Sequence, residues 1–253
     1  MAHCRKAFTL IELLVVIAVI AVLMAIIMPA LQKAKESARE VKCRSNLRNV
    51  GVGLTMYLQE NDFKPFNNDS TNGFYWYTAT GDLRPTTDGD AYWGVAYKTY
   101  LKDPGVFGCP SFRSVAEGLI YNVSPKLIYN AAYSVSRYFW WDPKTSKVRT
   151  TLSTIRHQSE FIVAHDHVEP KLEQGVIDMF HNNGPGTKNL TAYREGGDRA
   201  KFYRGIFRHN IRSNAAFETG GRANILWLDA HVAPQAETTG DDIPVWYYTG
   251  NRP

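Results

Sequence analysis

The sequence predicts an α+β protein in which a long N-terminal helix packs on an antiparallel β-sheet head with long loops. Three observations predict it: an apolar segment near the N-terminus, an amphipathic stretch with helical spacing directly after it, and short aromatic runs separated by turn residues in the remainder. The 253 residues are 44% hydrophobic and 21% charged, which excludes disordered, collagen-like and disulfide-dense classes. A net charge of +5 gives little reason to expect a nucleic-acid partner.

The apolar segment covers residues 8–31 and has the length of a membrane-spanning helix. Leu13–Met28 contains sixteen residues without one polar side chain, and Glu12 is the only charged residue of the segment. Twenty-four helical residues at about 1.5 Å each span roughly 36 Å, which exceeds a hydrocarbon core of about 30 Å. We therefore expect the protein to cross a membrane once or to be delivered by this segment.

Glu12 distinguishes between three interpretations of the segment. A secretory signal would have a shorter apolar stretch with a clear small-residue cleavage site after it. A plain single-pass anchor leaves unexplained a carboxylate that costs on the order of 2.5–3.5 kcal/mol at the bilayer centre and less near the interface. A third interpretation has to supply the positively charged partner that a carboxylate in this environment is expected to have.

The residues around Glu12 favour the third interpretation. Ala7-Phe8-Thr9-Leu10-Ile11-Glu12, after a short basic leader and before the apolar run, resembles the cleavage and methylation site of type IV prepilins and type II secretion pseudopilins. The resemblance implies that prepilin peptidase cuts between Ala7 and Phe8 and that the new Phe8 amine is N-methylated. It also implies that Glu12 pairs with the N-terminal amine of a neighbouring subunit, so that two charges are desolvated together.

Three further features bear on this resemblance. The family usually has Gly before the cut, where this chain has Ala7; a small residue is kept, so we expect processing, with room for slower cleavage. Pro29 stands where many pilins carry a proline and is expected to kink or loosen the helix. Six Lys and Arg residues follow the segment between residues 32 and 48, the reverse of the positive-inside pattern. Because long C-terminal domains cross largely regardless of charge, we expect the leader in the cytoplasm and the head in the periplasm, with the helix in a bacterial inner membrane.

Residues 32–60 predict an amphipathic stalk helix that continues the apolar segment. Its apolar residues recur at spacings of three and four, and charged residues occupy the other face. An unbroken helix from Phe8 to about Gln59 would be roughly 75–80 Å long. The chain is thus expected to divide into a leader (1–7), a transmembrane or filament-core helix (8–31), a stalk helix (32–60) and a β head (61–253).

The head sequence consists of short aromatic runs broken by Gly, Pro, Asn and Asp. Such runs are typical of strands, and an antiparallel sheet packed on the stalk helix is the economical arrangement. The expected strands are Phe74–Tyr77, Ala132–Phe139, Glu160–Ala164, Ala223–Leu228 and Val245–Tyr248.

Four motifs of the stalk and head carry a second resemblance. They are Cys43-x-x-Asn46-Leu47-Arg48 with Tyr57, Val106-Phe107-x-Cys109-Pro110-Ser111, Arg208-His209-Asn210, and Ala223-Asn224-Ile225-Leu226-Trp227-Leu228-Asp229-Ala230-His231-Val232. The set is similar to that of a large pseudopilin-like group abundant in planctomycete and verrucomicrobial relatives, which implies a type IV pilin-like fold. That group usually has Asp-Gly-His in the last motif. Ala230 replaces the Gly here, which puts in doubt a tight turn with positive φ.

The cysteines agree with an exported head. Cys4 lies in the expected leader and would be removed, which leaves Cys43 and Cys109 as an even pair. In an oxidising periplasm a disulfide between them would tie the stalk helix to the loop that ends at Cys109, and it would contribute about 2–5 kcal/mol. Two buried free thiols are the alternative, because spacing does not establish geometry.

One constellation could carry chemistry: His165-Asp166-His167 and His209, with Asp229 and His231. The candidate metal ligands in it are His165, His167, His209, Asp229 and His231. Imidazole and carboxylate groups at strand ends can bind Zn²⁺ or activate water. The spacing matches no metalloprotease helix motif, nucleophile elbow or phosphate loop. A structural hydrogen-bonded cluster is therefore the preferred interpretation, a divalent metal ion is the alternative, and hydrolytic catalysis ranks below both.

Together these observations predict a structural subunit without a cofactor, and not an enzyme, that polymerises through its N-terminal helix into a type IV pilus or a type II secretion pseudopilus. Its expected partners are further copies of itself in a homopolymeric filament, prepilin peptidase, an inner-membrane assembly platform and other minor pilins. The filament would serve protein secretion or lie at the cell surface. A membrane-anchored metal-binding hydrolase delivered by a pilin-like leader is the alternative from another class.

Overall fold

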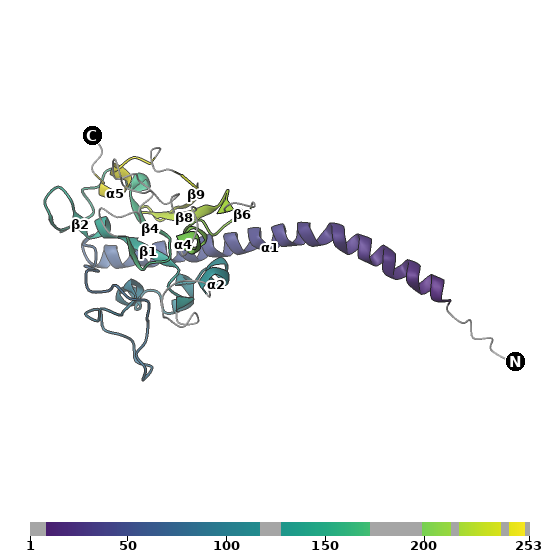
Figure 1. Cartoon of the computed structure of the whole chain (residues 1–253). Coiled ribbons are helices and arrows are strands. Elements are labelled where there is room, and N and C mark those ends of the chain that lie inside the picture. Colours follow the sequence, from purple (N-terminus) through teal and green to yellow (C-terminus); the bar gives the residue numbers. More distant parts are fainter. Residues whose placement is uncertain (1–8, 117–127, 173–198, 214–217, 239–242, 251–253) are drawn as a thin grey trace.

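One helix, α1 (Leu10–Glu60), sets the shape of the molecule: its second half packs against the head, and its first half projects away from it (Figure 1). The structure is a computed structural model that describes residues 9–116, 128–172, 199–213, 218–238 and 243–250. The expected cleavage and methylation residues, Ala7 and Phe8, lie outside this part of the chain.

The helix α1 runs without a break for 51 residues, which corresponds to about 77 Å. Pro29 lies inside it, and the ribbon bends within the N-terminal half to which Pro29 belongs (Figure 1). Among the described residues, α1 is the one helix that is long and apolar enough to cross a membrane. The apolar segment and the stalk therefore form one continuous rod.

The head is built around a five-stranded sheet with the strand order β5-β1-β4-β8-β9. The strands are β1 (Tyr133–Ser136), β4 (Ile162–Asp166), β5 (Lys171–Leu172), β8 (Arg222–Trp227) and β9 (Val232–Ala236). All neighbouring pairs are antiparallel except β1 and β5, which are parallel, so the sheet is mixed and not purely antiparallel as expected. The predicted α+β class, a long N-terminal helix packed on a β-sheet head, is confirmed, and the arrangement is consistent with a pilin-like fold.

Short elements surround this sheet. They are the helices α2 (Pro110–Ala116), α4 (Arg199–Ile206) and α5 (Trp246–Thr249), the 3-10 turns η1 (Trp93–Tyr97), η2 (Pro104–Phe107), η3 (Arg137–Phe139) and η4 (Gln158–Glu160), and the strand pairs β2 (Trp141–Asp142) with β3 (Lys147–Val148) and β6 (Arg212–Ser213) with β7 (Glu218–Thr219). The helix α1 contacts α2, η1, η2, β8 and β9.

Three of the five expected strands lie in the sheet, as β1, β4 and β8. The run 74–77 forms only isolated bridges, from Tyr75 to Ala91 and from Tyr77 to Leu83. The run 245–248 is wrong as a strand, because it is mostly the helix α5, which ends at Gly250 with φ 70°. Aromatic content alone does not separate a strand from a short buried helix, so periodicity could not resolve this segment.

The core lies between α1 and the sheet. Leu47, Val50, Leu54 and Leu58 are buried on the inner face of α1. Gly51 lies on the same face, where a Cβ atom would come within 2.7 Å of Leu226 Cδ1. Glycine at this position allows the helix to approach β8 more closely than any other residue would permit.

The turn between β8 and β9 keeps the tight geometry that Ala230 had put in doubt. Ala230 adopts φ 66°, a left-handed conformation that glycine accepts readily and alanine does not. The turn closes through hydrogen bonds from Ala230 N to Trp227 O and from Trp227 N to His231 O. The alanine is thus tolerated, with local backbone strain.

Candidate functional site: the assembly helix and its junction with the head

The first half of α1 presents apolar side chains on every side. From Leu10 to Leu31 its large hydrophobic side chains are 45–79% exposed. Each fully buried Leu, Ile or Val side chain contributes about 1.5–3 kcal/mol, so a surface of this size is stable only in lipid or against other protein. The helix is therefore built to be covered by something outside its own chain.

Glu12 lies in the first turn of this helix, where it completes a capping box with Thr9. The Glu12 N–H donates to Thr9 Oγ1 at 3.3 Å, and both Thr9 N and Thr9 Oγ1 donate to Glu12 Oε2 at 2.8 Å. The carboxylate thus satisfies orphan donors at the helix N-terminus within the single chain. The sequence analysis missed Thr9, although the Thr-x-x-Glu spacing before an apolar run is a known signal for this cap.

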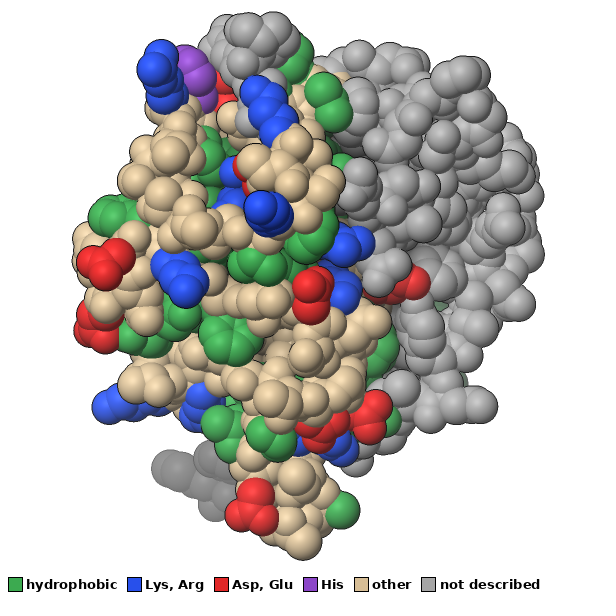
Figure 2. Space-filling view, turned by 90° about the vertical axis from the view of Figure 1, so that its left-hand side faces the viewer, with side chains coloured by type: hydrophobic (Ala, Val, Ile, Leu, Met, Phe, Trp, Pro, Cys, Tyr) green, Lys and Arg blue, Asp and Glu red, His purple; other side chains and the backbone are tan. Residues whose placement is uncertain are grey.

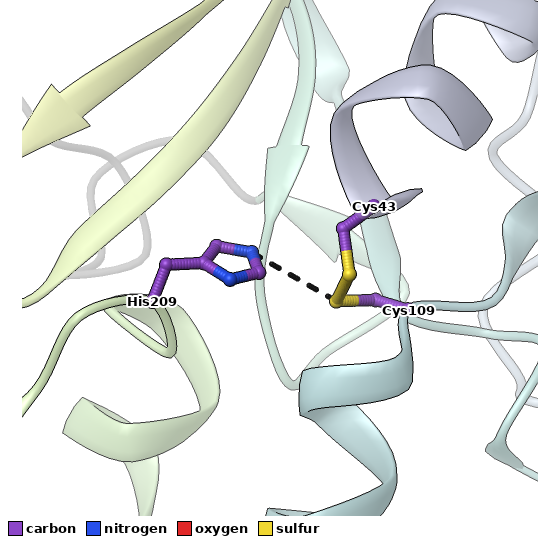
Figure 3. A group of neighbouring side chains, drawn as sticks. All are labelled: Cys43, Cys109 and His209. Carbon is purple, nitrogen blue, oxygen red and sulfur yellow. Dashed lines mark hydrogen bonds between the residues drawn. A yellow bond between two sulfur atoms is a disulfide. The ribbon is translucent and has the colours of Figure 1, made fainter. Parts of the chain in front are cut away.

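A disulfide between Cys43 and Cys109 joins α1 to the start of α2, with their Cα atoms 4.8 Å apart (Figure 3). Two hydrogen bonds beside it strengthen the same junction: Asn46 Nδ2 donates to Gly108 O at 2.8 Å, and Tyr133 Oη donates to Cys43 O at 3.0 Å. All of these groups are buried. The helix α1 is therefore fixed covalently and by hydrogen bonds to the head.

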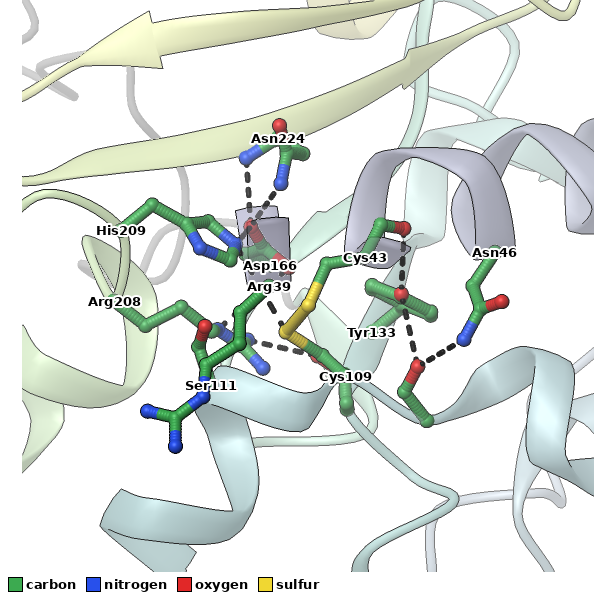
Figure 4. The surroundings of a disulfide bond; sticks show 12 residues. Arg39, Cys43, Asn46, Cys109, Ser111, Tyr133, Asp166, Arg208, His209 and Asn224 are labelled. Carbon is green, nitrogen blue, oxygen red and sulfur yellow. Dashed lines mark hydrogen bonds and ion pairs between the residues drawn. A yellow bond between two sulfur atoms is a disulfide. The ribbon is translucent and has the colours of Figure 1, made fainter. Parts of the chain in front are cut away.

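A buried polar cluster lies beside the disulfide (Figure 4). Asp166 at the end of β4 accepts a hydrogen bond from Asn224 N at 2.7 Å, lies 3.2 Å from His209 Nε2 and pairs with Arg208 at 3.6 Å. Burial tends to raise the pKa of Asp166, but Arg208 and His209 outweigh it and hold that pKa below its ordinary value. The cluster therefore contains a buried carboxylate that stays ionised because cations surround it.

Arg208 connects several elements at this point. Its Nη2 donates to Ala132 O at 2.8 Å and to His167 O at 2.9 Å. Its guanidinium also lies over the ring of Phe112 from α2, 4.6 Å from the ring centroid. The side chain thus holds the ends of two strands and α2 together, which assigns it a structural role.

His209 links the cluster to α1. Its Nε2 lies 3.8 Å from Cys109 Sγ, and its Nδ1 lies 3.6 Å from Glu36 on α1, whose carboxylate also accepts a hydrogen bond from Ser111 at 2.8 Å. Burial lowers the pKa of His209, but the neighbouring carboxylates of Asp166 and Glu36 outweigh it and raise that pKa above its ordinary value. Protonation of His209 therefore favours the docked arrangement of helix and head.

The other four residues of the predicted constellation lie elsewhere. His165 and His167 point to the opposite side of the chain from Asp166, because side chains alternate along a strand. His165 Nδ1 lies 2.9 Å from Asp166 O, and His167 Nδ1 accepts from Glu169 N at 3.0 Å. Burial is the main cause that lowers the pKa of His165 to about 4 and that of His167 well below its ordinary value, so both stay neutral.

Asp229 and His231 lie in the β8–β9 turn, far from His209. His209 pairs with Arg222 at the start of β8, and the strand then runs extended to Trp227, roughly 17 Å away, before the turn that holds Asp229 begins. The five residues therefore do not form one metal site. Among the described residues, the group close enough to hold an ion is Cys43, Cys109 and His209, and both cysteines are already joined in the disulfide.

The sequence analysis placed Asp166 in the candidate constellation and quoted Ser111, Arg208 and Asn224 within motifs, but it assigned none of them a role at the junction. It missed Glu36 altogether. Glu36 had no signal of its own, because it looked like one more charge on the solvated face of the stalk.

In a comparison with protein families, residues 3–28 match the prokaryotic N-terminal methylation motif. No curated protein and no solved structure matches the chain. The resemblance of the head to planctomycete and verrucomicrobial relatives therefore stays a prediction. The matched range contains Ala7, Phe8 and Glu12, and the apolar helix that follows suits membrane anchoring. The chain thus carries the prepilin-type cleavage and methylation motif, as its N-terminal sequence indicated.

Proposed function

We propose that this protein is a structural subunit of a type IV pilus or a type II secretion pseudopilus, polymerised through the apolar half of α1. The observation that carries the proposal is the conjunction of the methylation motif with an apolar helix that projects from a folded head and is not covered by it. In a filament, neighbouring helices would replace lipid around the same side chains. The protein would then act by assembly and not as an enzyme.

The processing steps follow from the motif. Prepilin peptidase would cut between Ala7 and Phe8 and the new amine would be methylated, with the leader in the cytoplasm and the head in the periplasm. Glu12 then lies four residues after the mature N-terminus. Its carboxylate, which the single chain holds against Thr9, would exchange that contact for the Phe8 amine of a neighbour.

Substitutions at Glu12 test the proposal in cells that make the full-length precursor. Glu12→Ala and Glu12→Gln should both abolish incorporation into sheared filaments, measured by immunoblotting of the filament fraction. Glu12→Gln is the sharper variant, because Gln can still complete the capping box while it lacks the negative charge. Glu60→Ala, an acid on the same helix at its far end, is the matched control and should assemble normally.

The head must remain folded in these variants, which the intact Cys43–Cys109 disulfide reports on non-reducing gels. Normal assembly of Glu12→Gln would contradict the proposed charge pairing, and a protein that never enters a filament would contradict the assembly role. The hydrolase alternative is less favoured, because Asp229 and His231 lie in the β8–β9 turn, at the other end of β8 from His209.

A further inference from the structure

A hollow lies at the end of the head where α1 finishes, the end that faces the viewer in Figure 2. Its volume is ≈ 290 Å³, and a smaller hollow continues from it along the seam between α1 and β8. The lining residues are Thr55, Leu58, Gln59, Phe63, Leu152, Gln158, Leu228 and Asp229. We call this hollow the distal pocket. None of its lining residues belongs to the N-terminal methylation motif or to the junction around the Cys43–Cys109 disulfide.

The distal pocket combines apolar walls with one charged group. Leu58 and Leu152 are buried, and Phe63 is 42% exposed. Asp229 is the charged residue of the lining, and its Oδ1 is held by His231 through N at 3.1 Å and through Nδ1 at 2.5 Å. Its second oxygen, Oδ2, makes no hydrogen bond within the described part of the chain. A pocket of this chemistry suits a long apolar stem that ends in a cation, as Lys and Arg side chains do.

The backbone around the distal pocket is strained. Of the five non-glycine residues with positive φ in the described ranges, three flank the pocket: Asp62 at 53°, Phe63 at 57° and Ala230 at 66°. Such residues concentrate at binding and switching sites, where the surroundings maintain them. Phe63 and Asp229 lie in the pocket lining because of these turns.

Suitable cations lie on the same chain at the opposite end of the head. Lys33 and Lys35 are exposed on α1. They precede Glu36, which contacts the head, and neither forms an ion pair within the described residues. Arg39 and Arg44, by contrast, pair with Glu36 and Glu40 on their own helix. Membrane orientation does not explain these lysines. They follow the apolar segment, on the expected periplasmic side, where the positive-inside pattern predicts few Lys and Arg residues.

We propose that the distal pocket of one copy receives the Lys33–Lys35 segment of α1 from the next copy, with an ammonium group against Asp229. The proposal rests on the filament role proposed above and names one of its contacts. Because the two surfaces lie at opposite ends of the head, the contact is heterologous, and such a contact repeats into an open helical polymer. Lys35 lies twenty-five residues before the end of α1. Lys35 of one copy therefore lies level with the distal pocket of the other when the two copies are displaced by about 38 Å along the helix axis.

Cysteine cross-linking in assembled filaments tests this contact. The full-length chain would carry Cys4→Ser, Asp229→Cys and either Lys33→Cys or Lys35→Cys, and sheared filaments would be treated with bismaleimidoethane. A head-to-tail contact should give a ladder of covalent oligomers. Asp82→Cys, which replaces an exposed acid in another loop, is the matched control for Asp229→Cys and should give no ladder.

Filaments without ladders from either lysine position would overturn the proposal and leave the assembly role intact. Ladders that form instead when Arg48→Cys is paired with Asp229→Cys would also overturn it. Failure of the unmodified protein to form filaments at all would count against the assembly role itself, so the two failures are distinguishable.

Charge reversal gives a second measurement for the case in which a cysteine variant does not assemble. Asp229→Lys should reduce filament mass at least tenfold, and combination with Lys33→Glu and Lys35→Glu should restore a large part of it. Wild-type assembly of Asp229→Lys, or no rescue by the combined variant, would refute the contact.

Discussion

The Cys43–Cys109 disulfide should be the largest single contribution to the stability of the head that can be removed by substitution. The two cysteines are separated by 66 residues in the sequence, and closing a loop of that size in the unfolded chain corresponds to about 4 kcal/mol. Both side chains are fully buried, so replacing Cys43 and Cys109 by Ala leaves no exposed thiol and no new charge. The expected loss in the free energy of unfolding is therefore about 4 kcal/mol.

Urea unfolding of the full chain in detergent micelles measures this loss. All six Trp residues lie after residue 60, so tryptophan fluorescence follows the head and not the apolar helix. With a denaturant slope of about 2 kcal/mol per molar urea, the midpoint should fall by about 2 M. Wild-type protein treated with a dithiol reductant should behave like the double variant.

Cys4→Ala is the control for this experiment. Because Cys4 lies in the expected leader, this substitution should leave the midpoint of urea unfolding unchanged. A loss below about 1 kcal/mol in the double variant would refute the reasoning. Equal midpoints for the oxidised and the reduced wild-type protein would refute it as well, because the cross-link would then not restrict the unfolded chain.

Three further predictions concern single residues of the head and the junction. Ala230→Gly should raise the free energy of unfolding by about 0.5–1 kcal/mol in the same urea assay, because glycine relieves the strain of the left-handed backbone conformation. The gain is reduced because glycine also gives the unfolded chain more conformational freedom. A loss of stability would contradict the inferred strain. Gly51→Ala should destabilise by about 1–3 kcal/mol despite the higher helix propensity of Ala, because the new Cβ overlaps Leu226, and Gly89→Ala, where a Cβ meets open space, serves as its control. The stability difference between wild type and His209→Gln should shrink as the pH rises from about 6 to about 8.5. Because the pKa of His209 is raised in the folded state, its protonation stabilises the fold fully below the pKa of the unfolded chain, and this stabilisation is lost as the pH rises through the pKa of the folded state. A difference that grows with pH would contradict the contacts of His209 with Asp166 and Glu36.

The sequence determined the N-terminal part of this protein almost completely. Sixteen consecutive apolar residues directly after a basic leader predict a helix covered by lipid or by other protein. The spacing of three and four between apolar residues through residue 58 predicts an amphipathic helix. The motif around Glu12 is local, so it could be identified without any knowledge of the fold. The α+β class followed from the same contrast between a periodic first part and an irregular remainder.

Local sequence patterns were not sufficient to predict the secondary structure and strand pairing of the head. The run 245–248 has the aromatic content of a strand and folds as a helix, and the parallel pairing of β5 with β1 left no mark in the sequence. The histidines show the same limit, because neighbours in the sequence such as His165 and Asp166 point to opposite sides of a strand. Residues that looked like one constellation were thereby separated.

Only the tertiary structure decided which side chains meet. Glu36 on α1 meets both Ser111 and His209 because α1 and α2 are held side by side. Asp166 stays ionised because Arg208 is buried against it. The distal pocket likewise forms where the end of α1 meets the turn after β8, two segments that are far apart in the sequence. Periodicity and motif spacing describe what lies along the chain, whereas contacts between distant segments depend on packing geometry that no short stretch of sequence contains.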